Sequence, residues 1–340
     1  PGDPDDNEIC DGLDNDCDGT LDNDIDDIVC YSGNPDTENV GICQSGLRSC
    51  SDGQFGACVG EILPAEEICD ELDNDCDGEV DEGVECGDGT ICNGEQEPPC
   101  NGCPVGTIIP ENWVCIPSGT FMMGDNTINT SSPSHLVLVP TFFMSRSEVT
   151  VEEYGNCVEE GVCTNPESDH ERCNWDEPNR ENHPINCVTW YQARDYAIWM
   201  DARLLTESEW EFAARSRGSY SHYPWGDVPE PSCNEVIIMD ENEVFGCGTN
   251  TTAPTCSRIA GVSNQGVCDM LGNVWEWTQD CWHTNYIDAP GDGSAWISGP
   301  CATRIHRGMA LDYPGNRTNA VSRNRDNPNH TSWDLGFRIA

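Results

Sequence analysis

Two short stretches of the chain place many carboxylates around a single cysteine. The first, EICDGLDNDCDGTLDND, spans residues 8–24, and the second, EICDELDNDCDGEVDEG, spans residues 67–83, so the motif repeats with a period of 59 residues. Carboxylates at this density repel one another, and a bound cation would neutralise them. The repeat therefore indicates two metal sites, with a pair of solvated acidic turns as the alternative.

The acidic residues follow the spacing of the first part of an EF-hand calcium loop. That loop has oxygen ligands at positions one, three and five, glycine at six, a carbonyl at seven and an acid at nine. Ca²⁺ prefers such hard oxygen ligands, and glycine permits the sharp turn. Position twelve holds Ile25 and Val84 instead of glutamate, so these are not EF-hands. The predicted calcium ligands are Asp14, Asp16, Asp18, Thr20 and Asp22 in the first copy and Asp73, Asp75, Asp77, Glu79 and Asp81 in the second, with Asp11 and Asp70 as further candidates.

The Asp-rich repeat with its internal cysteines resembles the metal-binding repeats of bacterial surface proteins of the MopE type. Thrombospondin type 3 repeats are a more distant likeness. In such a module we expect the disulfides Cys10–Cys17 and Cys69–Cys76, each of which would pin one loop. The expected module is rich in disulfides and poor in regular secondary structure.

The composition excludes some partners. The chain has 62 acidic and 15 basic residues, for a formal charge of −47, and every basic residue is arginine. Phosphates would be repelled, so we expect no nucleic-acid partner and no insertion into anionic membranes. Adaptation to high salt is an alternative explanation of the acidic surface.

The 23 cysteines favour an oxidising compartment, because disulfides persist outside the reducing cytosol. Zinc is the alternative, but it would require matching C-x-x-C pairs, and Cys100–Cys103 is the only one. The chain starts at Pro1 and shows no apolar span, so we expect a processed protein at the cell exterior, most simply a bacterial secreted protein. The odd count leaves one cysteine, expected within residues 1–115, free or paired between chains.

The sequence changes character near residue 105, which predicts one domain over residues 1–104 and another over 105–340. In the second, capping boxes predict helices that start at Thr150, Thr189 and Thr206. Short apolar runs broken by Gly, Pro and Asn surround them, which indicates an irregular α+β fold. On one face of the second helix the pattern places Ala193, Tyr196, Ala197 and Met200.

Motifs of this second domain resemble those of the formylglycine-generating-enzyme (FGE-sulfatase) family. They are IPSGTFMMGD, EVTVEEY, INCVTWYQARDYAIWM, ARLLTESEWEFAAR, YPWGD, CDMLGNVWEWTQD and the terminal GFRIA, in this order. The resemblance implies a C-type-lectin-like fold over about residues 106–340. It also implies an enzyme that oxidises a substrate cysteine with copper, held by two cysteines that follow an Arg-Gly-Gly-Ser-Trp strand.

The chain departs from the family at this catalytic strand. Arg307 and Gly308 match, but the next three residues are Met309, Ala310 and Leu311, and no cysteine follows Cys301. Soft thiolates are what a Cu(I) site requires. We therefore expect a non-catalytic member of the family, not an enzyme.

The resemblance also implies a structural calcium site in the GNVWEW loop, with Gly272, Asn273, Val274 and Glu276 as ligands. The alternative is that Asn273 and Glu276 only hydrogen-bond the loop. Short cysteine spacings predict five local disulfides: Cys157–Cys163, Cys173–Cys187, Cys233–Cys247, Cys256–Cys268 and Cys281–Cys301.

Together these features predict a calcium-binding structural or adhesive protein at the cell exterior, with self-assembly into filaments through Ca²⁺ and through contacts between acidic residues and arginines. Two alternatives stay open. One is a secreted copper oxidase with an unrecognised site, and the other is a lectin-like receptor for a glycan or another surface ligand.

Overall fold

The computed structural model divides into two compact units, Pro1–Gly106 and Thr107–Ala340. The sequence placed the boundary at residues 104 and 105, two residues earlier. The structure describes residues 9–13, 15, 20–22, 25, 27–51, 53–66, 73–78, 103, 109–110, 112–167, 169–219, 221–299 and 301–340.

The first unit is built from short strands. Strand β1 (Ile28–Cys30) pairs antiparallel with β2 (Gly46–Arg48), and β3 (Cys50–Ser51) pairs antiparallel with β4 (Gln54–Phe55). Single bridges add Val59 beside Leu47 and Ile62 beside Gln44. Among the described residues of this unit, the buried apolar side chains are Cys30, Cys43 and Cys76, all of them half-cystines. In the described part of this unit, disulfides therefore take the place of a hydrophobic core.

The disulfides of this unit correct two sequence predictions. Cys10 pairs with Cys50 instead of Cys17, and Cys76 pairs with Cys43 instead of Cys69, while Cys30 pairs with Cys58. Each acidic loop is thus tied to the segment between the repeats and is not closed on itself. The physical reason is that the apolar side chains of the first loop, Leu13 and Leu21, are exposed and form no core of their own. Such a loop needs an ordered partner, and the small sheet between the repeats provides it.

The second unit contains the three predicted helices. They are α1 (Val151–Glu159), α2 (Trp190–Trp199) and α3 (Glu207–Ala214), and each begins with a complete capping box. Ala193, Tyr196 and Ala197 are buried on α2 as predicted, but Met200 is the C-cap residue and is 39% exposed. The helical face ends where the backbone leaves the helix, one residue before Met200.

A four-stranded sheet lies at the centre of this unit, in the order β11 (Arg323–Asp326), β10 (Arg304–Arg307), β9 (Trp275–Cys281) and β12 (Leu335–Phe337). Strand β12 runs parallel to β9, and the other pairs are antiparallel. Two further pairs join β5 (Trp113–Ile116) to β8 (Phe142–Ser145) and β6 (Gly119–Met123) to β7 (His135–Val139). The predicted mixture of helices and strands is confirmed.

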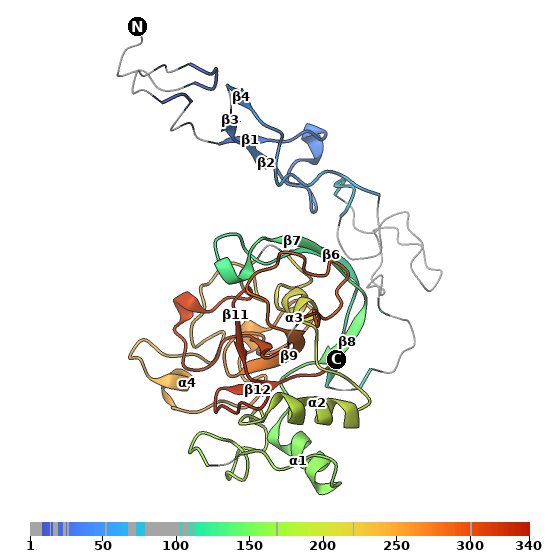
Figure 1. Ribbon diagram of the computed structural model, residues 1–340, viewed down its shortest axis with the longest axis vertical. Coiled ribbons are helices and arrows are strands. Elements are labelled where there is room, and N and C mark those ends of the chain that lie inside the picture. The colour runs from blue at the N-terminus through green and yellow to red at the C-terminus, as the bar shows by residue number, and fades with distance from the viewer. Residues whose placement is uncertain are drawn as a thin grey trace. The chain divides into compact units, whose positions relative to one another are not determined.

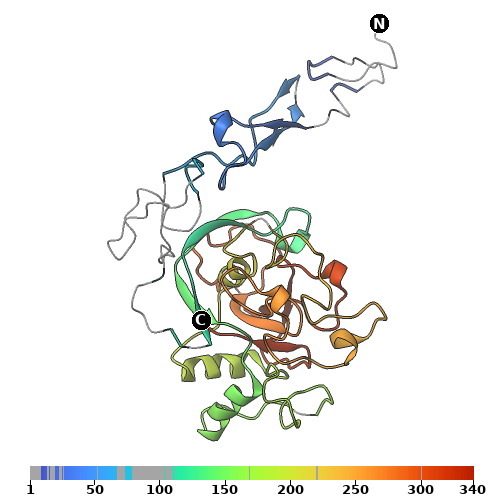
Figure 2. The ribbon, with the colours of Figure 1, turned by 180° about the vertical axis from the view of Figure 1, so that it is seen from behind.

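The helices cover different parts of this sheet. Helix α3 contacts β6, β7, β9 and β10, so it packs between the β6–β7 hairpin and the central sheet. Helices α1 and α2 pack together at the end of the unit opposite that hairpin (Figures 1 and 2). A one-turn helix, α4 (Phe245–Gly248), lies in a long loop before β9. All five disulfides predicted for this unit are confirmed.

Buried ion pairs connect α3 to the sheet. The Arg307 guanidinium donates to Glu207 Oε1 at 2.7 Å and to Glu211 Oε2 at 2.6 Å, and all three side chains are buried. Arg323 donates to both oxygens of Glu207. Burial acts to raise the pKa of Glu207, but Arg323 and Arg307 outweigh it and hold that pKa below its usual value. The two arginines thus keep a carboxylate charged inside the core.

Replacing Arg307 should therefore destabilise the second unit strongly. In Arg307→Met the carboxylates of Glu207 and Glu211 lose a buried partner, and we expect a loss of about 3–5 kcal/mol in the free energy of unfolding. Chemical denaturation monitored by tryptophan fluorescence measures this loss. The control is Arg325→Met, an exposed residue of β11 whose guanidinium lies over Trp282, where about 1 kcal/mol or less is expected. Equal effects of the two substitutions would contradict this role of Arg307.

Candidate metal centre

Three carboxylates converge in the second acidic loop. Carboxylate oxygens of Asp73, Asp75 and Asp77 all lie within 4.8 Å of one another. Asp77 N donates to Asp73 Oδ1 and to Asp75 Oδ1, both at 3.1 Å, and Gly78 N donates to Asp73 Oδ2 at 2.9 Å. Asp73 is buried and the other two are more exposed. Backbone amides therefore fold the loop around its first aspartate.

This geometry suits a hard cation. Each carboxylate oxygen can accept more than one partner, so a bond from a backbone amide leaves room for an ion. Three negative charges this close are unfavourable unless a cation compensates them, and carboxylates are the ligands that Ca²⁺ and Mg²⁺ prefer. The structure thus brings together three of the five predicted ligands of this copy. Glu79 and Asp81, with the further candidate Asp70, lie outside the described residues.

The first loop is described only in part, because Asp14, Asp16 and Asp18 lie outside the described residues. Asp22 Oδ1 accepts from Asp11 N at 3.0 Å and from Gly12 N at 2.9 Å, so it folds its loop as Asp73 folds the second. Asp22 lies within 4.8 Å of the sulfurs of Cys10 and Cys50. Those sulfurs form a disulfide and are not thiolate ligands. Thr20 is exposed.

In the second unit, the side chains of the predicted GNVWEW ligands bond to protein groups. Glu276 accepts from Arg338 at 2.6 Å through both oxygens and from Trp210 Nε1 at 2.7 Å. Asn273 Oδ1 accepts from Ala253 N, and its amide nitrogen donates to Glu148. Both side chains therefore hydrogen-bond within the protein, and the calcium site implied for this loop stays a prediction. Gly272 has a φ of 77°, a left-handed value that glycine adopts readily.

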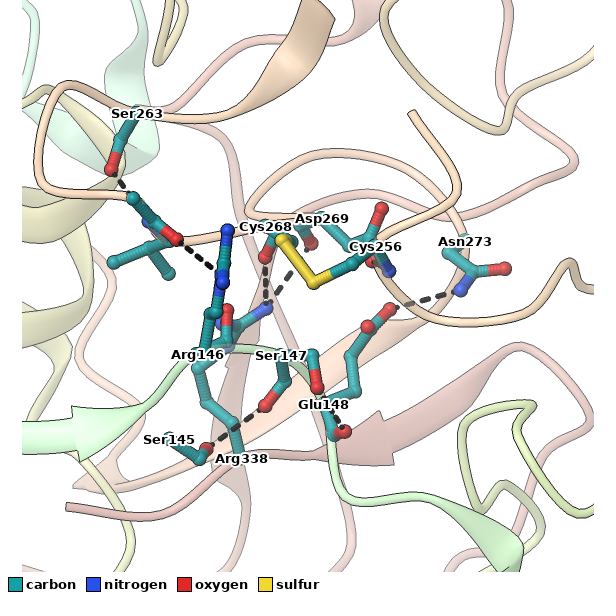
Figure 3. Close-up of a disulfide and its surroundings, with 12 residues drawn as sticks. Ser145, Arg146, Ser147, Glu148, Cys256, Ser263, Cys268, Asp269, Asn273 and Arg338 are labelled. Carbon is teal, nitrogen blue, oxygen red and sulfur yellow. Dashed lines mark hydrogen bonds between the residues drawn. A yellow bond between two sulfur atoms is a disulfide. The ribbon is translucent and has the colours of Figure 1, made fainter. Parts of the chain in front are cut away.

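Two buried acids in this neighbourhood were missed by sequence reasoning. Glu148 is fully buried, and its Oε2 has no hydrogen-bond partner among the described residues. Figure 3 shows it next to Asp269 and the Cys256–Cys268 disulfide, with its other oxygen bonded to Asn273. Burial and the neighbouring Asp269 charge raise the pKa of Glu148, and burial also raises the pKa of Asp269. Glu148 lies in the motif EVTVEEY and Asp269 in the motif CDMLGNVWEWTQD, but nothing in the sequence showed that these two acids lie side by side.

The residues that replace Gly-Ser-Trp after Gly308 have a packing role in this chain. Met309, Ala310 and Leu311 are buried in the hydrophobic core directly after Arg307 and Gly308. All eleven cysteines of residues 107–340 are disulfide-bonded. A site for Cu(I) built from two thiolates therefore does not fit this unit.

A groove of about 720 Å³ lies elsewhere on this unit. Pro314, Gly315 and Asn316 line one side, and the other side includes Asp240 and the Cys233–Cys247 disulfide. Asn316 also begins an Asn-rich stretch, residues 316–333. Within the part of the chain that the structure describes, no helix is long and apolar enough to cross a membrane.

Comparisons with known proteins agree with this division of the chain. Residues 107–340 match the family described as the sulfatase-modifying factor enzyme 1-like domain, FGE-sulfatase. Residues 3–23 and 64–82 match a family described as a metal-binding motif of the Cu-binding MopE type. The stretch of residues 64–82 contains the carboxylate cluster of Asp73, Asp75 and Asp77.

Individual relatives cover the second unit. The formylglycine-generating enzyme of Streptomyces coelicolor is 33% identical over 47% of this chain, and the inactive Cα-formylglycine-generating enzyme 2 of Bos taurus is 31% identical over 46%. The chain spans about half the length of these two relatives, 53% and 50%. The structure of PvdO from Pseudomonas aeruginosa aligns with 67% of this chain and 92% of its own, with a TM-score of 0.58 and 28% identity. Through residues 107–340, the chain belongs to the FGE-sulfatase family.

Proposed function

We propose that this chain is a calcium-binding structural or adhesive protein of the cell exterior, whose FGE-sulfatase domain is not catalytic. The observation that carries the proposal is the convergence of Asp73, Asp75 and Asp77 within 4.8 Å in a loop that matches a metal-binding family. Ca²⁺ is the ion assigned, because the described ligands are all carboxylates, with no histidine and no free thiolate among them. The many disulfides support an extracellular location.

The loss of catalysis is supported by the chemistry of the second unit. Its cysteines are all in disulfides, and the residues after Gly308 are core side chains. A relative at a similar level of identity is named inactive, so loss of activity has precedent within the family. The domain then contributes a rigid surface to the protein.

Self-assembly is the second part of the proposal. Only Arg48 lies in residues 1–115, and the other 14 arginines lie in residues 116–340. A contact between the acidic unit of one copy and arginines of the next is heterologous, and such contacts build fibres unless they close into a ring. Ca²⁺ would reduce the repulsion between copies that each carry a formal charge of −47.

A ligand-binding function for the second unit is the alternative that a specific observation favours. The groove beside Pro314, with its rigid disulfide wall, has the volume of a small-molecule site. Glycan binding by the purified protein, measured on a glycan array, would favour this alternative.

Calcium should stabilise the first unit selectively. Chelation leaves the carboxylates of the loops uncompensated, and each filled site contributes about 2.7 kcal/mol at a Ca²⁺ concentration near 100 times its Kd. Differential scanning calorimetry with Ca²⁺ and with EDTA measures this effect. We expect Asp75→Ala to reduce the calcium-dependent shift, whereas Glu241→Ala, an exposed acid of the second unit, should leave it unchanged. Identical melting with Ca²⁺ and EDTA would show that the loops are only solvated turns.

The purified protein should lack formylglycine-generating activity. Loaded with Cu(I) and supplied with oxygen, it is expected to leave the cysteine of a sulfatase-type peptide unchanged, as read by mass spectrometry. The Streptomyces coelicolor enzyme under the same conditions is the positive control. Conversion above a copper-only blank would overturn the non-catalytic assignment.

Assembly should depend on calcium. Multi-angle light scattering is expected to show species larger than one chain with millimolar Ca²⁺, and a monomer after chelation. If the protein is a monodisperse monomer in both conditions, at concentrations well above micromolar, this result would contradict the assembly proposal and strengthen the ligand-binding alternative.

A further inference from the structure

The cysteine at the centre of the second acidic loop has an unfavourable backbone conformation. Cys76 lies between Asp75 and Asp77, is 1% exposed and has a φ of 62°. A side chain with a β-carbon disfavours this left-handed region, whereas glycine enters it freely. Gly78 has a φ of 99° two residues later, so the loop contains two left-handed turns and only one of them uses glycine.

The Cys43–Cys76 disulfide fixes this residue to the segment between the repeats. Around that bond, Ile42 N donates to Asp73 O at 3.1 Å, and Ala65 N donates to Asn74 O at 2.9 Å. Gly41 lies so close to Asp73 that a β-carbon on it would be 2.5 Å from Asp73 Cγ. The start of the loop is therefore held by backbone contacts, and its centre is held by the disulfide.

The left-handed turn at Cys76 is what brings the ligands together. It directs Asp77 N at the carboxylates of both Asp73 and Asp75, at 3.1 Å each, and the three acids lie on one side of the loop. Without a constraint, repulsion between these carboxylates and the preference of Cys76 for negative φ would both open the turn.

We propose that the Cys43–Cys76 disulfide controls the metal affinity of this loop, so that the oxidised protein binds the ion more tightly than the reduced one. Reduction transfers two electrons and two protons from a dithiol to the disulfide, which yields two cysteine thiols and leaves the dithiol oxidised. Cys76 then leaves the left-handed region, the carboxylates separate and the affinity for the ion falls. This inference rests on the proposed calcium function of the same loop.

The test measures Ca²⁺ binding by isothermal titration calorimetry on the full-length, oxidised protein. The background carries Asp16→Ala, which removes a predicted ligand of the first loop. In the variant Cys43→Ser/Cys76→Ser the disulfide is absent and residue 76 keeps its β-carbon. We expect this variant to bind Ca²⁺ about tenfold more weakly, because that factor corresponds to the free-energy cost of a left-handed backbone at a residue with a β-carbon. In Cys43→Ser/Cys76→Gly, glycine tolerates the turn, and we expect affinity within about threefold of the background protein.

The matched control removes another disulfide of the same unit. Cys30→Ser/Cys58→Ser breaks a bond that does not involve the loop, and it should leave the affinity close to that of the background protein. Equal binding by the Ser/Ser variant and the background would overturn the inference. So would equally weak binding by the Gly and Ser variants, since that result would show the disulfide acting through general folding of the unit. If the oxidised background protein binds no Ca²⁺, the proposed calcium function fails, and this inference fails with it.

Discussion

Mutual repulsion of carboxylates is the constraint on which the rest of this structure depends. A chain with 62 acidic and 15 basic residues can fold only where opposite charges, amide donors or cations compensate its acids. The two units meet this requirement in different ways. The second buries arginines against acids in its core, and the first, with Arg48 alone, has backbone amides, disulfides and the cations we propose.

In the second unit, the ion pairs that compensate the buried acids also hold the fold together. Arg307 and Arg323 fix the start of α3 to the central sheet through Glu207, and Arg338 joins β12 to β9 through Glu276. Arg338 lies in the terminal GFRIA motif, and Arg307 precedes Gly308 in the segment where the chain still matches the family. The framework therefore persists without the thiolates, because its stability depends on ion pairs and packing and not on the reaction.

Local signals predicted much of this fold from the sequence. The three capping boxes involve residues only three positions apart, and the five disulfides of the second unit span 6 to 20 residues, so short-range spacing was sufficient. The three disulfides described in the first unit span 28 to 40 residues and depend on how the segment between the repeats folds, which spacing alone cannot give. Glu148 and Asp269 were missed for the same reason, since tertiary packing alone makes them neighbours.

We propose that the acidic loops are calcium centres that complete a disulfide-stapled unit. The most direct test is an anomalous difference map from crystals grown with Ca²⁺ and with Tb³⁺, an ion that occupies calcium sites and scatters strongly. The account predicts a peak within bonding distance of Asp73, Asp75 and Asp77. An ordered loop with no peak, at a saturating ion concentration, would contradict it.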